Sequence, residues 1–139
     1  MGKSAASIAR FKRRMAKIPL EVKAAVATEA LLQAHRLGGA IQQAAPKDEG
    51  DLKASVRIEG GKYGDRFYVR AGGPLTTRPV REGASAFYDY ANAVEHGTAK
   101  MRAEPFFYPT YRAHRKAIRA GISATALKAA QRYNAGLGA

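Results

Sequence analysis

The first pattern of apolar and polar positions in the chain predicts a short basic helix. Apolar side chains recur every three or four residues, while lysine and arginine occupy the other faces. Ser4 is placed to cap this helix, and Pro19 ends it. We therefore expect residues 1–18 to form a basic N-terminal helix or arm. Its apolar positions are Ile8, Phe11, Met15 and Ile18.

A longer amphipathic stripe follows and predicts the most regular element of the chain. Pro19 suits the first turn of this second helix, and Pro46 ends it. Gly38 and Gly39 weaken its last part. The stripe repeats by three or four residues through Val22, Val26, Ala30, Ala34, Leu37 and Ile41.

The period then changes from helical to alternating. Residues 46–51 combine proline, acidic side chains and glycine, which is typical of a turn in which Gly50 takes a positive φ angle. Apolar and polar residues alternate over 52–59 and again over 67–71, and this predicts two antiparallel strands. Residues 73–85 form a long connection of a kind that is usually functional or disordered.

The last third of the chain predicts one more strand and one more helix. The strand covers residues 87–95, and an Ala-rich helix runs from Pro109 to about residue 133. Gly121 lowers the regularity of that helix, and residues 134–139 form a flexible tail. Residues 19–133 are thus expected to be one α+β domain, in which a small antiparallel sheet of three to four strands packs against the long helix and the C-terminal helix. The N-terminal basic helix is an addition to this domain.

Composition predicts a thin core. Leu, Ile, Val and Phe supply 25 of the 139 residues, whereas alanine alone supplies 29. A chain of this length is able to bury roughly 68% of its unfolded surface. With so few large apolar side chains, we expect much of the stability to come from neighbouring subunits, because apolar area buried at an interface stabilises as it does in a core.

Charge is concentrated at the two ends of the chain. The net charge is +13, of which residues 1–23 and 112–139 each contribute +6. Two interpretations remain open: solvated helix faces, or a surface that meets a polyanion such as nucleic acid. Neither end has the strong aromatic face typical of membrane attachment. The candidate contacts to DNA or to an acidic partner are Lys12, Arg13, Arg14, Arg112, Arg115, Lys116 and Arg119.

Several classes of function are disfavoured. The absence of cysteine removes disulfides, thiolate chemistry and Cys-based zinc sites, and His35, His96 and His114 lack metal-ligand spacing. Neither a nucleophile elbow nor a glycine-rich phosphate loop is present. No apolar run reaches the length of a membrane span, and no secretory signal is evident. We expect no enzyme activity, cofactor, metal or membrane partner, and synthesis in the cytoplasm.

Glu95 stands out at the end of the third expected strand, just before Gly97 and Thr98. A carboxylate there accepts local backbone N–H groups, meets an arginine, or pairs with a neighbouring subunit. As strand neighbours, Glu95 and His96 would point to opposite faces and could not act together. The aromatic residues 106–108 are framed by prolines, and they suit either a core plug or a stacking surface for bases.

Three short motifs follow one another between about residues 20 and 130. The first joins an Ala-Pro helix end to an acidic-x-Gly turn and a Leu-basic strand start. The second is Tyr-Ala leading to Glu-x-Gly-Thr, and the third is a Pro-Phe-x-x-Pro junction into the last helix. In series they resemble the head–tail joining family of long-tailed bacteriophages, the tail-completion or tail-terminator proteins. The matching residues are Ala45, Pro46, Asp48, Gly50, Leu52, Lys53, Tyr90, Ala91, Val94, Glu95, Gly97, Thr98, Pro105, Phe106 and Pro109.

This resemblance implies a structural virion protein rather than an enzyme. It implies a ring of about six copies at the neck, which terminates or completes the tail tube and docks it to the head connector or stopper protein. DNA would pass through the lumen of the ring. The protein would occupy the host cytoplasm during assembly and the head–tail junction of the virion, prophage product or gene-transfer particle afterwards. The alternative, from another class, is a free-standing basic DNA-binding protein.

Overall fold

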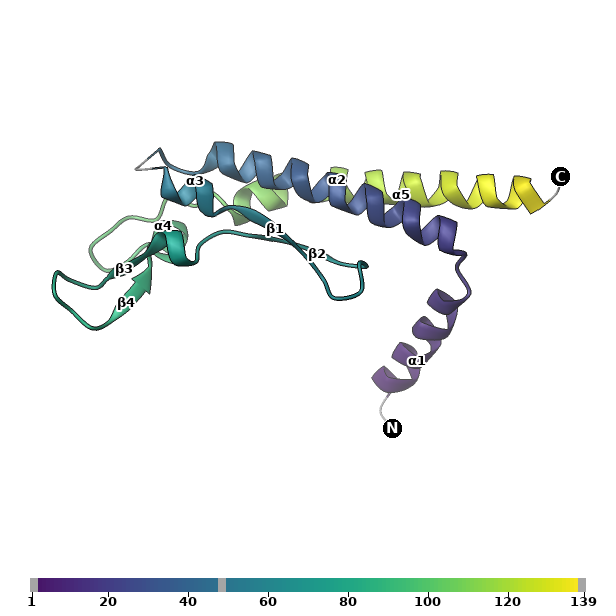
Figure 1. Cartoon of the computed structure of the whole chain (residues 1–139), viewed down its shortest axis with the longest axis horizontal. Helices are drawn as coiled ribbons and strands as arrows, with labels where there is room; N and C mark the ends of the chain where they lie inside the picture. The colour runs from purple at the N-terminus through teal and green to yellow at the C-terminus, as the bar shows by residue number, and fades with distance from the viewer. Residues whose placement is uncertain (1–2, 48–49, 138–139) are drawn as a thin grey trace.

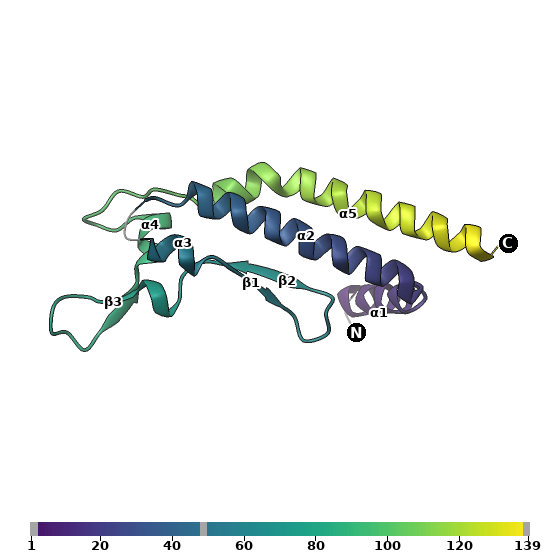
Figure 2. The same ribbon diagram turned by 45° about the horizontal axis from the view of Figure 1, so that its top comes forward.

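Two long antiparallel helices form the backbone of the molecule (Figures 1 and 2). The computed structural model describes residues 3–47 and 50–137. Helix α2 (Leu20–Ala44) packs along helix α5 (Tyr108–Leu137). Gly121 permits this approach, because a Cβ at that position would lie 2.6 Å from Nε2 of Gln33. Helices α2 and α5 are both continuous through their glycines. Helix α5 also extends through residues 134–137, which the sequence predicts to be part of a flexible tail.

Helix α1 (Lys3–Ala16) projects from the start of α2, as Figure 1 shows. The chain turns at Pro19, whose ψ angle of 148° is extended rather than helical. The expected N-terminal helix is confirmed, although it begins at Lys3 and so includes Ser4 in its first turn instead of being capped by it. Residues 1, 2, 138 and 139 lie outside the described part of the chain.

A hairpin covers one side of α2. Strand β1 (Arg57–Gly60) pairs with β2 (Phe67–Arg70) in antiparallel register, with Ile58 opposite Val69. The hairpin approaches α2 closely at Gly38, where an added Cβ would lie 3.0 Å from Cδ1 of Ile58. The expected antiparallel pair is thus confirmed for residues 57–60 and 67–70.

The other small elements correct three expectations. Residues 51–55 form helix α3 (Asp51–Ser55), not the start of a strand. Residues 73–85 contain a 3₁₀ helix η1 (Pro74–Thr76) and strand β3 (Thr77–Pro79). The expected third strand is strand β4 (Phe87–Asp89) followed by helix α4 (Tyr90–His96).

The expected single sheet of three to four strands is also wrong. Strands β3 and β4 pair only with each other, so the described residues form two separate two-stranded antiparallel sheets. A two-stranded sheet is marginal by itself and needs a packing partner. The β1–β2 hairpin has α2 as its partner, whereas the β3–β4 ribbon extends from the end of the molecule in Figure 1. The α+β class itself is confirmed.

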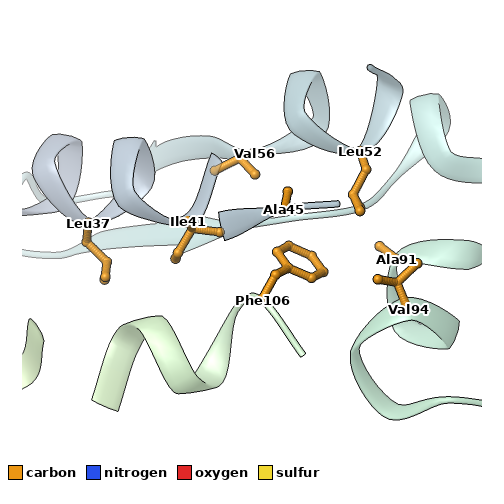
Figure 3. Close-up of a cluster of buried hydrophobic side chains, with 8 residues drawn as sticks. All are labelled: Leu37, Ile41, Ala45, Leu52, Val56, Ala91, Val94 and Phe106. Atoms are coloured by element: carbon orange, nitrogen blue, oxygen red, sulfur yellow. The ribbon is translucent and has the colours of Figure 1, made fainter. Parts of the chain in front are cut away.

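The hydrophobic core lies at the C-terminal end of α2. Figure 3 shows the Phe106 ring between the end of α2 and helix α4, pointing toward Ala45. Within the described chain, eleven apolar side chains are buried, and four of these are alanines, which confirms the thin core. Phe106 is 2% exposed and is the largest of them. The central cluster consists of Leu37, Ile41, Ala45, Leu52, Val56, Ala91, Val94 and Phe106.

The chain exposes far more surface than a compact monomer of its size. Its accessible surface is 10430 Å², whereas a folded monomer of 14.9 kDa is expected to expose about 7,000 Å². On the same scaling the chain buries only about half of its unfolded surface, not the roughly 68% that its length allows. About 3,400 Å² of additional surface therefore remains in contact with solvent in the single chain.

The adjacent glycines of α2 provide a test of how the hairpin packs. Gly39→Ala should stabilise the fold by about 0.5–1 kcal/mol, because alanine is the better helix former and nothing lies within 4 Å of the new methyl group. Gly38→Ala should stabilise less or destabilise, because its methyl group would displace Ile58. Urea unfolding of both variants measures the difference. Equal stabilities would show that the hairpin does not approach α2 as described.

Candidate functional site

The carboxylate of Glu95 ties the end of α4 to the beginning of α5. Its Oε2 accepts the backbone N–H groups of Phe106 at 2.8 Å and Phe107 at 3.0 Å, and its Oε1 accepts that of Tyr108 at 3.0 Å. The first N–H groups of a helix have no partner within the helix. A negative charge is also favourable at this end of the helix dipole. Glu95 therefore caps α5 and fixes Phe106 in the core.

The Glu95 carboxylate is held in its charged form. Burial alone would raise its pKa, but the N–H groups of Phe107, Tyr108 and Phe106 outweigh burial, and the net result is a pKa below the ordinary value of 4.5. His96 contributes in the same direction. Because the folded-state pKa is lowered, the tie stabilises the fold fully above pH 4.5 and is lost as the pH falls through the folded-state value.

Asp89 forms a second tie at the opposite end of α4. Its Oδ1 accepts the N–H of Ala91 at 2.9 Å and the hydroxyl of Thr76 at 2.6 Å. Its Oδ2 accepts the N–H of Gly73 at 2.8 Å. Burial would raise the pKa of Asp89, but the hydrogen bonds, led by that from Thr76, lower it overall. Helix α4 is thus held at both ends by carboxylates, one from the residue that precedes it and one from its last turn.

Polar contacts connect this pair of ties to the β1–β2 hairpin. The N–H of Gly72 donates to the hydroxyl of Ser55 at 3.0 Å, and that hydroxyl donates to the carbonyl of Leu52 at 2.6 Å. The Arg57 guanidinium donates to the carbonyl of Gly72. We call the region built by Ser55, Arg57, Asp89, Glu95 and Phe106 the hub.

Gly97 turns the chain out of α4. Its φ angle is +75°, and its N–H donates to the carbonyl of Ala93 at 2.7 Å. A Cβ at this position would lie 2.8 Å from the backbone nitrogen of Ala103. Thr98 and Met101 then exchange backbone hydrogen bonds of 2.9 and 3.3 Å across a tight turn.

The structure brings the three motif segments together at the hub. Leu52, Ala91 and Phe106 share the core, and Glu95 bonds directly to Phe106. Gly50 has the expected positive φ, +87°. Asp48 lies outside the described residues. Among the other motif residues, Pro46 follows α2 and is half-buried, Tyr90 begins α4, Thr98 and Pro105 are exposed, and Pro109 occupies the first turn of α5.

Two site expectations need correction. Glu95 and His96 lie on a helix, not at the end of a strand, so the argument that they point to opposite faces of a sheet is wrong. Only Phe106 is a buried plug, because Phe107 is half-buried and Tyr108 is 51% exposed. The backbone N–H interpretation of Glu95 is confirmed, although its partners are 11 to 13 residues away in sequence.

Sequence reasoning missed Asp89 and Thr76, and it noted Ser55 only as a residue that continues the first motif. Asp89 directly precedes Tyr90 and is the N-cap of α4, a position at which aspartate is strongly preferred. That signal was available, but the aromatic residues around it suggested a strand. Arg78 was missed as well. Its guanidinium pairs with Asp51 at 2.6 Å and lies over the Tyr90 ring, 5.3 Å from the centroid.

The expected basic contact residues lie on α1 and α5, and all are exposed. On α5 four of them are spaced by three, one and three residues, which places them along one side of the helix. Helix α5 contains no acidic residue. These four residues are Arg112, Arg115, Lys116 and Arg119, and the three on α1 are Lys12, Arg13 and Arg14.

The hub borders a hollow of about 460 Å³, but its carboxylates are already occupied by hydrogen bonds. Over residues 3–47 and 50–137, no buried side-chain polar atom lacks a partner, and no three His, Asp or Glu side chains gather as a metal site would require. The described helices include none with the length and apolar character needed to cross a membrane.

No family model matches the sequence, and no curated protein or solved structure is significantly similar to it.

Removal of the Glu95 charge should destabilise the fold in a pH-dependent way. Glu95→Gln should cost about 1–3 kcal/mol at pH 7, because at least one of the three N–H groups loses a charged acceptor. The difference from the unmodified chain should shrink as the pH falls below 4.5. Glu104→Gln is the matched control, since that residue is exposed. Urea unfolding from pH 3 to pH 7 measures both, and a pH-independent difference would contradict the role given to the charge.

The turn at Gly97 should be intolerant of any side chain. Gly97→Ala combines an unfavourable φ with overlap against Ala103, and it should cost clearly more than the 1–2 kcal/mol typical of a left-handed residue alone. Gly83→Ala is the matched control, because Gly83 has a φ of +74° and nothing within 4 Å of an added Cβ. Thermal melting compares the two. A smaller loss at Gly97 than at Gly83 would contradict the described turn.

Proposed function

We propose that this chain is a structural virion protein that forms a ring at the head–tail junction. In this role it terminates or completes the tail tube and docks it to the head connector or stopper, without enzyme activity. Six copies form the ring, and DNA passes through its lumen.

The hub supports this proposal because it is a frame rather than a reactive site. The three segments that carry the resemblance share the core there, and Glu95 of the second segment accepts the backbone N–H of Phe106 in the third. A frame of this kind holds neighbouring surfaces in fixed positions without chemistry of its own. In this proposal the motif residues hold the chain in position and carry out no reaction. Glu95 and Gly97, for example, set the path of the chain between α4 and α5.

One observation carries the proposal, namely the excess of exposed surface. A standard protein interface buries about 800 Å² on each partner, and obligate interfaces bury more. The additional surface of about 3,400 Å² is therefore enough for two subunit interfaces and a docking face on each copy. A ring requires two different interfaces per subunit, because one patch meets a different patch of the next copy.

The basic helices suit the DNA that would fill the lumen. Contacts from Arg112, Arg115, Lys116 and Arg119 would be to phosphates, and so independent of sequence and weakened by salt. These four basic side chains on one side of α5 also favour the alternative function, a free-standing DNA-binding protein.

Assembly state separates the two functions. We expect the purified chain to form discrete rings in negative-stain micrographs, and its sedimentation coefficient to rise with concentration. It should also bind isolated tail tubes. A monomer or dimer that is independent of concentration and retards DNA at physiological salt would contradict the ring and favour the alternative.

A further inference from the structure

Helix α1 has an apolar side that is largely exposed. Ile8, Phe11 and Met15 are 54%, 62% and 41% exposed. At 100° per residue, Arg10, Arg13 and Lys17 fall on the opposite side of the helix. Helix α1 makes no extensive contact with another element of the described chain, and Figure 1 shows it projecting from the N-terminal end of α2.

A second apolar feature without a partner lies at the other end of the molecule. The ribbon groove is a hollow of about 920 Å³ between the β3–β4 ribbon and the turn at residues 98–101. Its lining includes Val80, Tyr88 and Met101, which are 61%, 44% and 42% exposed. Val94 joins the groove to the core.

Helix α1 of the same chain cannot reach this groove. The groove adjoins the C-terminal end of α2, whereas α1 is attached through Pro19 to the N-terminal end. The 25 residues of α2 span about 37 Å and the 14 residues of α1 span about 21 Å at the standard helical rise. An α1 helix that occupies the groove must therefore come from another copy.

We propose that α1 of one copy docks through Ile8, Phe11 and Met15 into the ribbon groove of a second copy, against Val80, Tyr88 and Met101. The contact joins two different surfaces, so it propagates from copy to copy and closes into a ring where the geometry allows. It also covers Val80 and Tyr88 of the two-stranded ribbon, which are exposed in the single chain. The inference deepens the proposed ring by naming one subunit contact, and in that respect it rests on the proposed function.

The charges of α1 agree with this orientation. With the apolar side against the groove, Arg10, Arg13 and Lys17 point away from the second copy. Lys12 and Arg14 lie at the margins of the contact. The groove contributes Lys100, so a basic side facing it would be repelled. The apolar side is therefore the docking side, and the basic side stays available to a polyanion.

The absence of natural cysteine allows a direct test by disulfide formation. A Phe11→Cys chain is mixed with a size-tagged Met101→Cys chain under mild oxidation, and a non-reducing gel measures the mixed dimer. A disulfide forms readily only when the two Cα atoms come within about 7 Å. The control pair, Arg13→Cys with Met101→Cys, has its first cysteine on the opposite side of α1. We expect several-fold more mixed dimer from the first pair than from the control.

A cysteine-free variant supplies an independent measurement. Phe11→Ser should weaken self-association by about tenfold to a hundredfold, as expected for removing one buried aromatic side chain. Arg13→Ser is the matched control and should have little effect. Circular dichroism checks that each variant is folded, which is expected because α1 makes no extensive contact with another element of its own chain.

The outcomes separate this contact from the proposed function. Rings without a preferential Phe11–Met101 crosslink would overturn the contact and leave the ring standing. A preferential crosslink in a protein that forms no ring and joins no particles would support the contact and overturn the proposed function. Equal crosslinking of the two pairs, or equal association of the two serine variants, would overturn the contact.

Discussion

The bonds from three backbone N–H groups to the carboxylate of Glu95 hold the remaining structure in place. These N–H groups belong to Tyr108, the first residue of α5, and to the two residues before it. Without a charged acceptor they would be left unpaired beside the core, which costs about 1–3 kcal/mol for each buried group. The bonds also set the position of Phe106, the largest fully buried side chain. Since Phe106 separates the end of α2 from α4, the placement of both helices follows from one carboxylate.

The dependence on carboxylates follows from the composition. A core with four alanines among its eleven buried apolar side chains removes little area from water, so each packing contact contributes little. Hydrogen bonds to charged groups are worth more than neutral ones, and Asp89 and Glu95 each accept three. The hub is therefore well determined at one end of the molecule. Helix α1 has no such tie among the described bonds, whereas the β3–β4 ribbon is joined to the hub only at its base, through Asp89 at the end of β4 and the Arg78–Asp51 pair.

The long helix α2 could be predicted from the sequence because its stripe extends far enough to reveal its period. The short strands β1 and β2 could also be predicted, because their alternating patterns flank a glycine-rich turn. The short helices could not. Leu52 in α3 and Val56 just after it are four apart, which fits both a helix and an alternating strand. In α4, Ala91 and Ala93 are two apart, which favoured a strand. Glu95 could be selected as a capping residue, but its partners could not be identified. They become neighbours only when α4 is helical and Gly97 reverses the chain.

The distribution of charge adds a further constraint on any assembly of this chain. Copies that each carry +13 repel one another, and the repulsion is strongest where their basic helices approach. Salt screens the repulsion between copies, but it also weakens contacts to a polyanion. A polyanion in the centre of a ring would remove the repulsion more effectively than salt, because it binds the assembled state in preference to the separate chains. Ring formation and DNA binding would then strengthen each other by linkage, without any contact between the DNA and the subunit interface. The middle of the chain, residues 24–111, contains the hub and has a net charge of only +1. The stability of the hub should therefore depend less on salt than the assembly of copies does.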